Sequence, residues 1–123
     1  MNKIKSLTRA EEDIMQFIWQ LGRCTVSDIL DLLPDPRPPH SSISSIVRIL
    51  ERKNFVGHKS YGRTYEYFPL ISKDEYSRKS VLSLIRDYFN GSPSELVSFL
   101  IAKEDASVEE MHDLIKDLKK KKA

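Results

Sequence analysis

The chain has 123 residues, a length that fits one small domain or two very small ones. Charged residues make up 31% and hydrophobic residues 40%, which predicts a globular chain and excludes a disordered one. The formal net charge of +2 excludes a molecule that is basic as a whole, and the single cysteine, Cys24, excludes an internal disulfide and a Cys-rich metal site.

The first predicted helix begins after Thr8 and ends near Leu21. Thr8 and Glu11 have the spacing of a capping box, and Gly22 is a typical helix stop. The helical period predicts a core face on this helix, made of Ile14, Phe17, Ile18 and Leu21.

A second, shorter helix is predicted over residues 26–33, with Thr25 as its N-cap. Residues 34–39 then hold four prolines, which remove backbone donors and disfavour helix at the preceding residue. The predicted buried side of the short helix is Val26, Ile29, Leu30 and Leu33.

The third predicted helix, residues 40–53, has two different sides. One is an apolar stripe at helical period, made of Ile43, Ile46, Val47 and Leu50. The other carries hydroxyls and guanidinium groups without a carboxylate, from Ser41, Ser44, Ser45, Arg48 and Arg52. Hydroxyls contact bases or phosphates, and arginine binds guanine or phosphate, so this side suits a DNA groove. An ordinary amphipathic surface helix with a serine N-cap is the alternative.

Basic charge is concentrated around this helix. From His40 to Arg63 the sequence has five lysines and arginines against one carboxylate, Glu51. Local concentration of this kind is the electrostatic footprint expected of a nucleic-acid surface.

The period changes to that of two strands, residues 55–60 and 63–68, around Tyr61 and Gly62. A hairpin directly after a recognition-type helix predicts the wing of a winged helix. Lys59, Tyr61 and Arg63 lie near its predicted tip, where they suit phosphate or minor-groove contacts. A solvated hairpin with incidental charge is the alternative here.

The second half turns helical from Ser72 onward. One long helix ends at Asn90 and Gly91, another begins at Ser92, and a last one begins at Ser107. About 50 residues cannot bury so many apolar side chains alone, which predicts a two-fold dimer. The predicted interface is Tyr76, Leu84, Ile85, Tyr88, Leu96, Leu100, Leu114 and Leu118.

The expected fold is therefore mainly α with a small β-hairpin. A winged helix-turn-helix DNA-binding domain occupies residues 1–70, and a three-helix dimerisation domain occupies residues 71–123. Two such domains in a dimer would read two half-sites of pseudo-palindromic double-stranded operator DNA.

Three segments resemble the penicillinase repressor (BlaI/MecI) family of bacterial winged-helix repressors, over nearly the whole chain. They are LTRAEEDIMQFIW at residues 7–19, SSISSIVRILERKNFVGHK at residues 41–59 and NGSPSELVSFLIAKEDASVEEMHDLIKDL at residues 90–118. The resemblance implies a homodimer that represses genes of antibiotic resistance or cell-wall stress. By position it implies groove-facing residues and wing residues, namely Ser41, Ser42, Ser44, Ser45 and Arg48, and Lys59, Tyr61 and Arg63.

The resemblance also implies a route of induction. In this family a membrane-bound sensor metalloprotease leads to cleavage of the repressor within the dimer domain. The matching bond would lie near Phe99 and Leu100. The family's site has Asn before Phe, whereas this chain has Phe99 before Leu100, with Ser98 before them. The paired Cys-x-Cys motifs of copper-responsive relatives do not occur here, so no metal or other cofactor is expected.

Other classes of function compete with a DNA-binding repressor. A winged helix used only for protein contact need not keep an acid-free face, and a small-molecule sensor with a pocket in the dimer domain stays open. An enzyme is disfavoured because the histidines are scattered and no catalytic motif occurs. The absence of a signal peptide and of a membrane-spanning apolar run predicts a cytoplasmic location.

Overall fold

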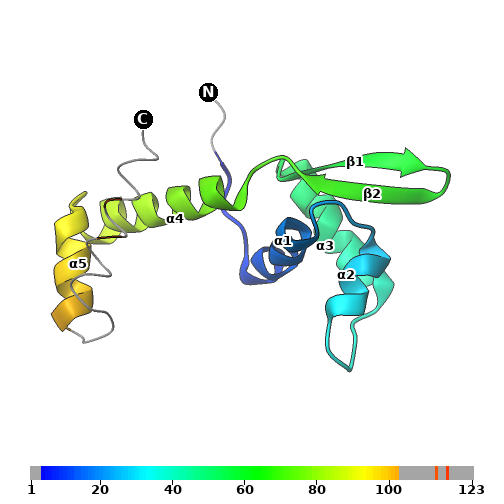
Figure 1. Cartoon of the computed structure of the whole chain (residues 1–123), viewed down its shortest axis with the longest axis horizontal. Coiled ribbons are helices and arrows are strands. Elements are labelled where there is room, and N and C mark those ends of the chain that lie inside the picture. The colour runs from blue at the N-terminus through cyan, green and yellow to red at the C-terminus, as the bar shows by residue number, and fades with distance from the viewer. Residues whose placement is uncertain (1–3, 103–112, 114–115, 117–123) are drawn as a thin grey trace. The chain divides into compact units, whose positions relative to one another are not determined.

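The computed structural model describes residues 4–102, 113 and 116. The chain divides into two compact units, Met1–Tyr76 and Ser77–Ala123, and the division falls inside a helix. The domain boundary after residue 70 stays a prediction. The elements, coloured along the chain in Figure 1, are α1 (Arg9–Leu21), α2 (Val26–Leu32), α3 (His40–Arg52), β1 (Val56–Tyr61), β2 (Thr64–Pro69), α4 (Lys73–Tyr88) and α5 (Pro93–Ala102).

The first two helices begin where the sequence predicts, because each has a complete capping box. The Glu11 backbone N–H donates to Thr8 Oγ1 over 3.2 Å, and the Thr8 N–H donates to the Glu11 carboxylate over 3.1 Å. Thr25 and Asp28 make the same reciprocal pair at the start of α2. These bonds satisfy donors that a helix N-terminus otherwise leaves unpaired.

The third helix begins differently from the serine-capped alternative. Its N-cap is Pro39, and no side chain caps it. Ser45 instead donates its hydroxyl to the Ser41 carbonyl, 2.9 Å away. The first serines of α3 are therefore not used to start the helix, and their side chains remain on its surface.

The core of the first unit lies between the three helices and the base of the hairpin. The predicted apolar stripe of α3 is confirmed, since Ile43, Val47 and Leu50 are buried and Ile46 packs against them. Buried side chains from all three helices, both strands and the start of α4 complete it: Ile14, Met15, Ile18, Cys24, Val26, Ile29, Phe55, Val56, Tyr67 and Tyr76.

One residue of the predicted α1 core face is wrong. Leu21 is 37% exposed, whereas Met15, which the prediction left out, is fully buried. Met15 is next to Ile14 and three residues before Ile18, so all three point to the same neighbours. Leu21 is the last residue of α1, where the chain turns away at Gly22.

The hairpin forms with strands displaced by one residue from the prediction. Tyr61 pairs with Thr64, so Gly62 and Arg63 make the two-residue loop, and Gly62 has a φ of 61°. A positive φ at the first loop position is what glycine permits there. Figure 1 shows the hairpin extending beyond α2 and α3.

A third strand position, which the sequence did not indicate, lies between α1 and α2. Cys24 forms a single antiparallel bridge with Tyr67 of β2. Its N–H donates to the Tyr67 carbonyl over 2.9 Å, and the Tyr67 N–H donates back over 2.7 Å. This bridge fixes the chain before α2 to the base of the wing.

The first turn of α4 closes the core of the first unit. The Tyr76 ring lies 5.4 Å from that of Phe55 and 5.8 Å from that of Trp19, centroid to centroid. Its hydroxyl donates to Glu12, and the Trp19 indole N–H donates to the Ile71 carbonyl. Trp19 and Tyr76 therefore both pack in the winged-helix core, although Tyr76 is expected at a dimer interface.

The second unit shows the predicted helix ends. After α4, Asn90 and Gly91 adopt positive φ values of 52° and 76°. Ser92 then accepts a hydrogen bond from the Glu95 N–H, and Pro93 is the first residue of α5. The last predicted helix lies outside the described residues except at Asp113 and Lys116. Within the described part of the chain, no helix has both the length and the apolar character that a membrane crossing requires.

Candidate nucleic-acid interface

The solvent-facing side of α3 carries the residues that the sequence singled out. Ser41, Ser42, Ser45, Arg48 and Arg52 are exposed, and Ser44 is half-buried. Because the opposite side of α3 is packed into the core, the orientation of this face is fixed. The structure thus brings hydroxyls and two guanidinium groups onto one helical surface.

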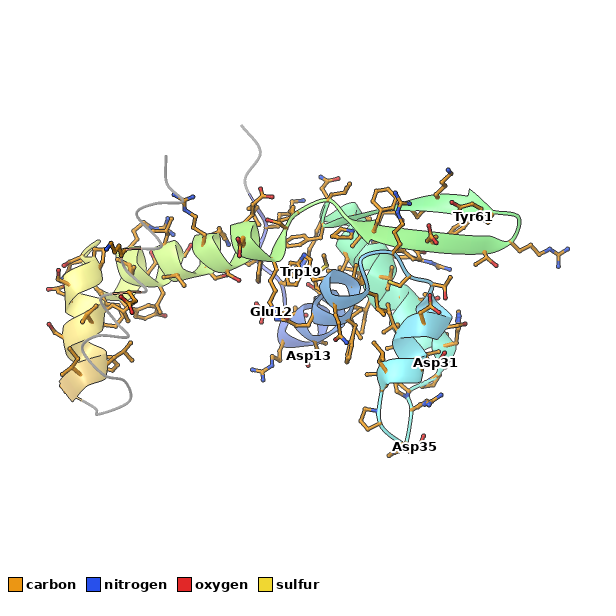
Figure 2. All side chains as sticks on the ribbon, viewed as in Figure 1. Glu12, Asp13, Trp19, Asp31, Asp35 and Tyr61 are labelled. Atoms are coloured by element: carbon orange, nitrogen blue, oxygen red, sulfur yellow. The ribbon has the colours of Figure 1, made fainter. Side chains whose placement is uncertain are left out.

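The wing presents its predicted cations near the free end. Lys59 and Tyr61 lie on the same face of the hairpin, with the Lys59 ammonium 5.5 Å from the Tyr61 ring centroid. Arg63 is exposed in the two-residue loop. Figure 2 shows Tyr61 toward the outer end of the wing, where 53% of the residue is exposed.

Charge pairing differs between this surface and the rest of the winged-helix unit. Among the residues that the structure describes, no carboxylate lies within 4 Å of Arg48, Arg52 or Arg63. Arginines elsewhere do have such partners: Arg9 pairs with Asp13, Arg23 with Glu66, and Arg37 with Asp31 and Asp35. The arginines of this unit without a described carboxylate partner therefore lie where the sequence predicts DNA.

A hollow of about 240 Å³ lies between the start of α2, the middle of α3 and the outer part of β2. Two arginines and several hydroxyls line it, and no carboxylate is among the lining residues that are described. Sequence reasoning missed its α2 and β2 members, because only the tertiary fold brings them beside α3. The lining is Thr25, Val26, Ser27, Ser44, Arg48, Arg63, Thr64, Tyr65 and Tyr67.

The root of the wing is joined to α3 by a histidine–carboxylate contact that sequence reasoning also missed. The Nδ1 atom of His58 on β1 lies 2.5 Å from the Glu51 carboxylate on α3. The His58 ring stacks on Tyr65, with centroids 4.4 Å apart and an interplanar angle of 18°. Glu51, the one carboxylate between residues 40 and 63, is thereby held at the wing.

The predicted dimer residues differ in exposure. Leu84 is 41% exposed and Tyr88 76% exposed, whereas Ile85 is buried. Leu96 and Leu100 of α5 are half-buried, and the neighbouring Phe99 is 50% exposed. Leu114 and Leu118 lie outside the described residues.

Metal chemistry has no evident centre in the part of the chain that the structure describes. No group of three or more His, Cys, Asp or Glu side chains is placed to hold an ion there. Burial raises the pKa of the Cys24 thiol to about 11, with smaller contributions from Asp28 and Glu66. Cys24 is therefore a neutral core side chain at physiological pH.

Known proteins resemble this chain over its length. The family model described as penicillinase repressor matches residues 7–120. The methicillin resistance regulatory protein MecI of Mammaliicoccus sciuri is 25% identical over 121 residues, covering 98% of both chains. The penicillinase repressor of Bacillus licheniformis is 24% identical, covering 99% of this chain and 96% of the relative.

A solved structure matches the winged-helix part. The solution structure of the DNA-binding domain of the repressor BlaI has a TM-score of 0.52 and 25% sequence identity. The match covers 62% of this chain and 94% of that chain. The expected architecture of helices with a β-hairpin wing is confirmed.

Proposed function

The chain belongs to the penicillinase repressor family, and we propose that it represses transcription by binding operator DNA with α3 and the wing. The observation that carries the proposal is the concentration of arginines without a described carboxylate partner on one face of the fold. Phosphates supply the missing negative charge, and the released counterions supply affinity.

In this proposal α3 lies in the major groove and provides direct reading of bases. The two hydrogen-bond acceptors of a guanine edge match the guanidinium of Arg48. Among the residues that the structure describes, no carboxylate forms an ion pair with this guanidinium. The exposed serines Ser41, Ser42 and Ser45 are short enough to let the helix approach the groove closely. Arg52, one turn beyond Arg48, meets a base or a phosphate further along the same groove.

The wing and the hollow hold the DNA backbone. In this proposal one DNA strand runs between α3 and the wing and passes over the hollow. There Ser27 and Thr64 offer hydroxyls and Arg63 offers a cation. Lys59 and Tyr61 continue this contact toward the minor groove. Such contacts fix the register of α3 without carrying sequence information themselves.

We further propose that the repressor acts as a homodimer held by its second unit. Leu84, Tyr88 and Phe99 expose large apolar surfaces in the single chain, and a second copy would cover them. Replacing Leu84 with Glu should raise the dimer dissociation constant at least about tenfold, because a charge would be buried at the interface. Sedimentation velocity checks this, and an unchanged profile would reject Leu84 as an interface residue.

Binding to chromosomal operators requires a cytoplasmic location, which we include in the proposal. By family resemblance, the regulated genes serve β-lactam resistance or cell-wall stress, and a membrane sensor metalloprotease induces them. Cleavage near Phe99 and Leu100 in α5 would end dimerisation. Mass spectrometry of the repressor from β-lactam-treated cells tests this, and an intact chain during full induction would rule it out.

The proposed function is tested by selecting operators from random duplex DNA at near-physiological salt, followed by sequencing. An enriched inverted repeat is expected, and its half-site spacing would define the dimer geometry. Binding without an enriched motif that disappears as salt rises would reduce the surface to a non-specific polyanion site. No binding at all would overturn the proposal.

A further inference from the structure

We propose that His58 is a positioning residue of the DNA surface, whose protonated imidazole holds Glu51 at the wing and leaves Arg48 available to DNA. Operator binding should then strengthen as the pH falls toward the acid side of neutrality. This inference rests on the proposed function and adds a form of regulation to it. It concerns a pair of residues that joins the two DNA-contacting elements.

The position of Glu51 makes its partner important. It is the one carboxylate between residues 40 and 63, and it lies two turns after Ser44 on the same side of α3. Arg48 precedes it by three residues, a spacing at which a carboxylate and a guanidinium pair on a helix. In the structure, however, the Glu51 carboxylate contacts His58 Nδ1 at 2.5 Å.

The His58 ring is held in place on the β2 side. Tyr65 stacks against it, and the Tyr67 ring lies 5.8 Å away at a tilt of 56°. His58 is also directly opposite Tyr67 in the hairpin register, and Tyr67 is itself fixed by the Cys24 bridge. These contacts hold the imidazole against β2 if the carboxylate turns back toward Arg48.

The groups that face His58 come from α3 and from β2. From α3 this group is Glu51, and Arg48, three residues before it, stays charged at all relevant pH values. From β2 they are Tyr65 and Tyr67; burial, more than the nearby Glu51 carboxylate, raises the pKa of Tyr67, so its hydroxyl stays neutral. An imidazole changes its charge between about pH 5 and 8.

The sign of the effect follows from the charges. When His58 carries a proton, the pair is neutral overall and the carboxylate is directed away from Arg48. When the proton is lost, a net negative charge remains beside incoming phosphates, and Glu51, held only by a neutral imidazole, competes with DNA for Arg48. The side chains of His58 and Glu51 are only 31% and 34% exposed, so water does not fully screen this charge. Binding DNA therefore favours the protonated state.

The experiment measures operator affinity between pH 5.5 and 8.5 at constant ionic strength, using the full chain and a selected operator duplex. We expect the wild-type affinity to fall about fivefold across this range, the size of a partly screened ion pair. His58→Gln should bind with the same affinity at every pH, and this affinity should equal the low affinity of the wild type at pH 8.5. Glu51→Gln should also bind with the same affinity at every pH, but at the high affinity of the wild type at pH 5.5, because no carboxylate remains to compete.

The opposite operator affinities expected of the two variants distinguish a positioning role from a simple structural contact. A contact needed only to hold the wing would weaken binding equally in both. His40→Gln, which removes the histidine at the start of α3, should keep the wild-type slope. An unchanged slope in either His58→Gln or Glu51→Gln, or low affinity in both, would overturn the inference. Failure of the wild type to bind any operator would instead overturn the proposed function.

If His58→Gln does not fold, Glu51→Gln alone still decides the matter. It should bind at pH 8.5 at least as tightly as the wild type does at pH 5.5. Weaker binding than wild type at pH 8.5 would contradict a competing carboxylate. Circular dichroism of each variant at both pH values verifies that folded proteins are compared.

Discussion

The charged residues at the end of α3 and those on its exposed face serve different purposes. Where α3 ends against α1, the Lys53 ammonium lies 2.6 Å from the buried Glu11 carboxylate and 3.1 Å from the Ser6 carbonyl. On the exposed face, Arg48 and Arg52 have no described carboxylate partner. The first arrangement joins parts of the fold that are distant in sequence, and the second leaves charge for a ligand.

This difference follows from the free energy of burying a charge compared with that of leaving it in water. A buried carboxylate such as Glu11 is tolerated only with a partner, so its removal is felt as lost folding free energy. An exposed arginine is already hydrated and contributes little to stability. Mutations at the two places should therefore change different observables, and this separation can be tested one residue at a time.

The largest effect is expected for Lys53→Met. It keeps the length of the side chain but leaves Glu11 buried without its cation, which should lower the free energy of unfolding by about 3 kcal/mol. Urea unfolding followed by the fluorescence of Trp19, the single tryptophan, reports on this unit. Lys59→Met on the wing is the control and should lose less than about 0.5 kcal/mol. Equal losses in both variants would erase the distinction.

Arg48→Ala should show the converse behaviour. Operator affinity should fall by about 1–3 kcal/mol, or about 5- to 150-fold, with relaxed specificity at one base pair. The urea midpoint should not change, because Arg48 is exposed and has no described ion pair. Fluorescence anisotropy on operator and mutated operators measures this. Arg9→Ala, which removes an exposed arginine paired with Asp13, is the matched control.

If Arg48→Ala weakens binding to every DNA sequence by the same factor, Arg48 contacts phosphate and not a base. In that case the slope of log affinity against log salt should fall by about 0.9. A variant with unchanged affinity would remove Arg48 from the interface altogether.

A smaller effect is expected at the hollow. Ser27→Ala deletes one hydroxyl that we assign to a backbone phosphate, and should weaken binding by about 0.5–1.5 kcal/mol on all sequences alike. Ser94→Ala is a close control, because both serines are the second residue of a helix that follows a hydroxyl-bearing cap. Similar affinities for the two variants would exclude Ser27 from the DNA contact.

The smallest effect concerns acid stability. The Lys53 hydrogen bond holds the pKa of Glu11 below its usual 4.5 despite burial, with help from Thr8. The folded state therefore binds fewer protons than the unfolded state, so this stabilisation is present above pH 4.5 and is lost as the pH falls through the folded-state pKa. Urea midpoints between pH 3 and 6 should fall less steeply in Glu11→Gln than in the wild type. Parallel dependences of the urea midpoint on pH in the two proteins would contradict a role of Glu11 in acid stability.

Much of this molecule could be predicted because its signals are local. The capping boxes at Thr8 and Thr25 set two helix starts within three residues of sequence, and the stripe through Ile43, Val47 and Leu50 set the inner side of α3. Once that side was known, Arg48 had to lie on the outside. Such inferences need only the helical period and the chemistry of helix ends.

Contacts between distant residues were decided by the tertiary structure. Nothing local pairs Glu11 with Lys53 across 42 residues, or Cys24 with Tyr67 at the base of the wing. The period alone assigned Leu21 to the core, but burial depends on which neighbour covers a position. Tyr76 likewise has an apolar ring suited to several surfaces, and its packing on Phe55 identifies the one it uses.

The sequence by itself therefore determined the elements, the inner and outer sides of α3, and the kind of ligand its outer side suits. The tertiary structure alone decided which charges are neutralised and which stay available. Neutralisation depends on distances of a few ångströms between elements, as for Glu51 and His58, and sequence spacing does not encode those distances. The spatial arrangement of charge, and so the working surface of this protein, emerges only in the folded chain.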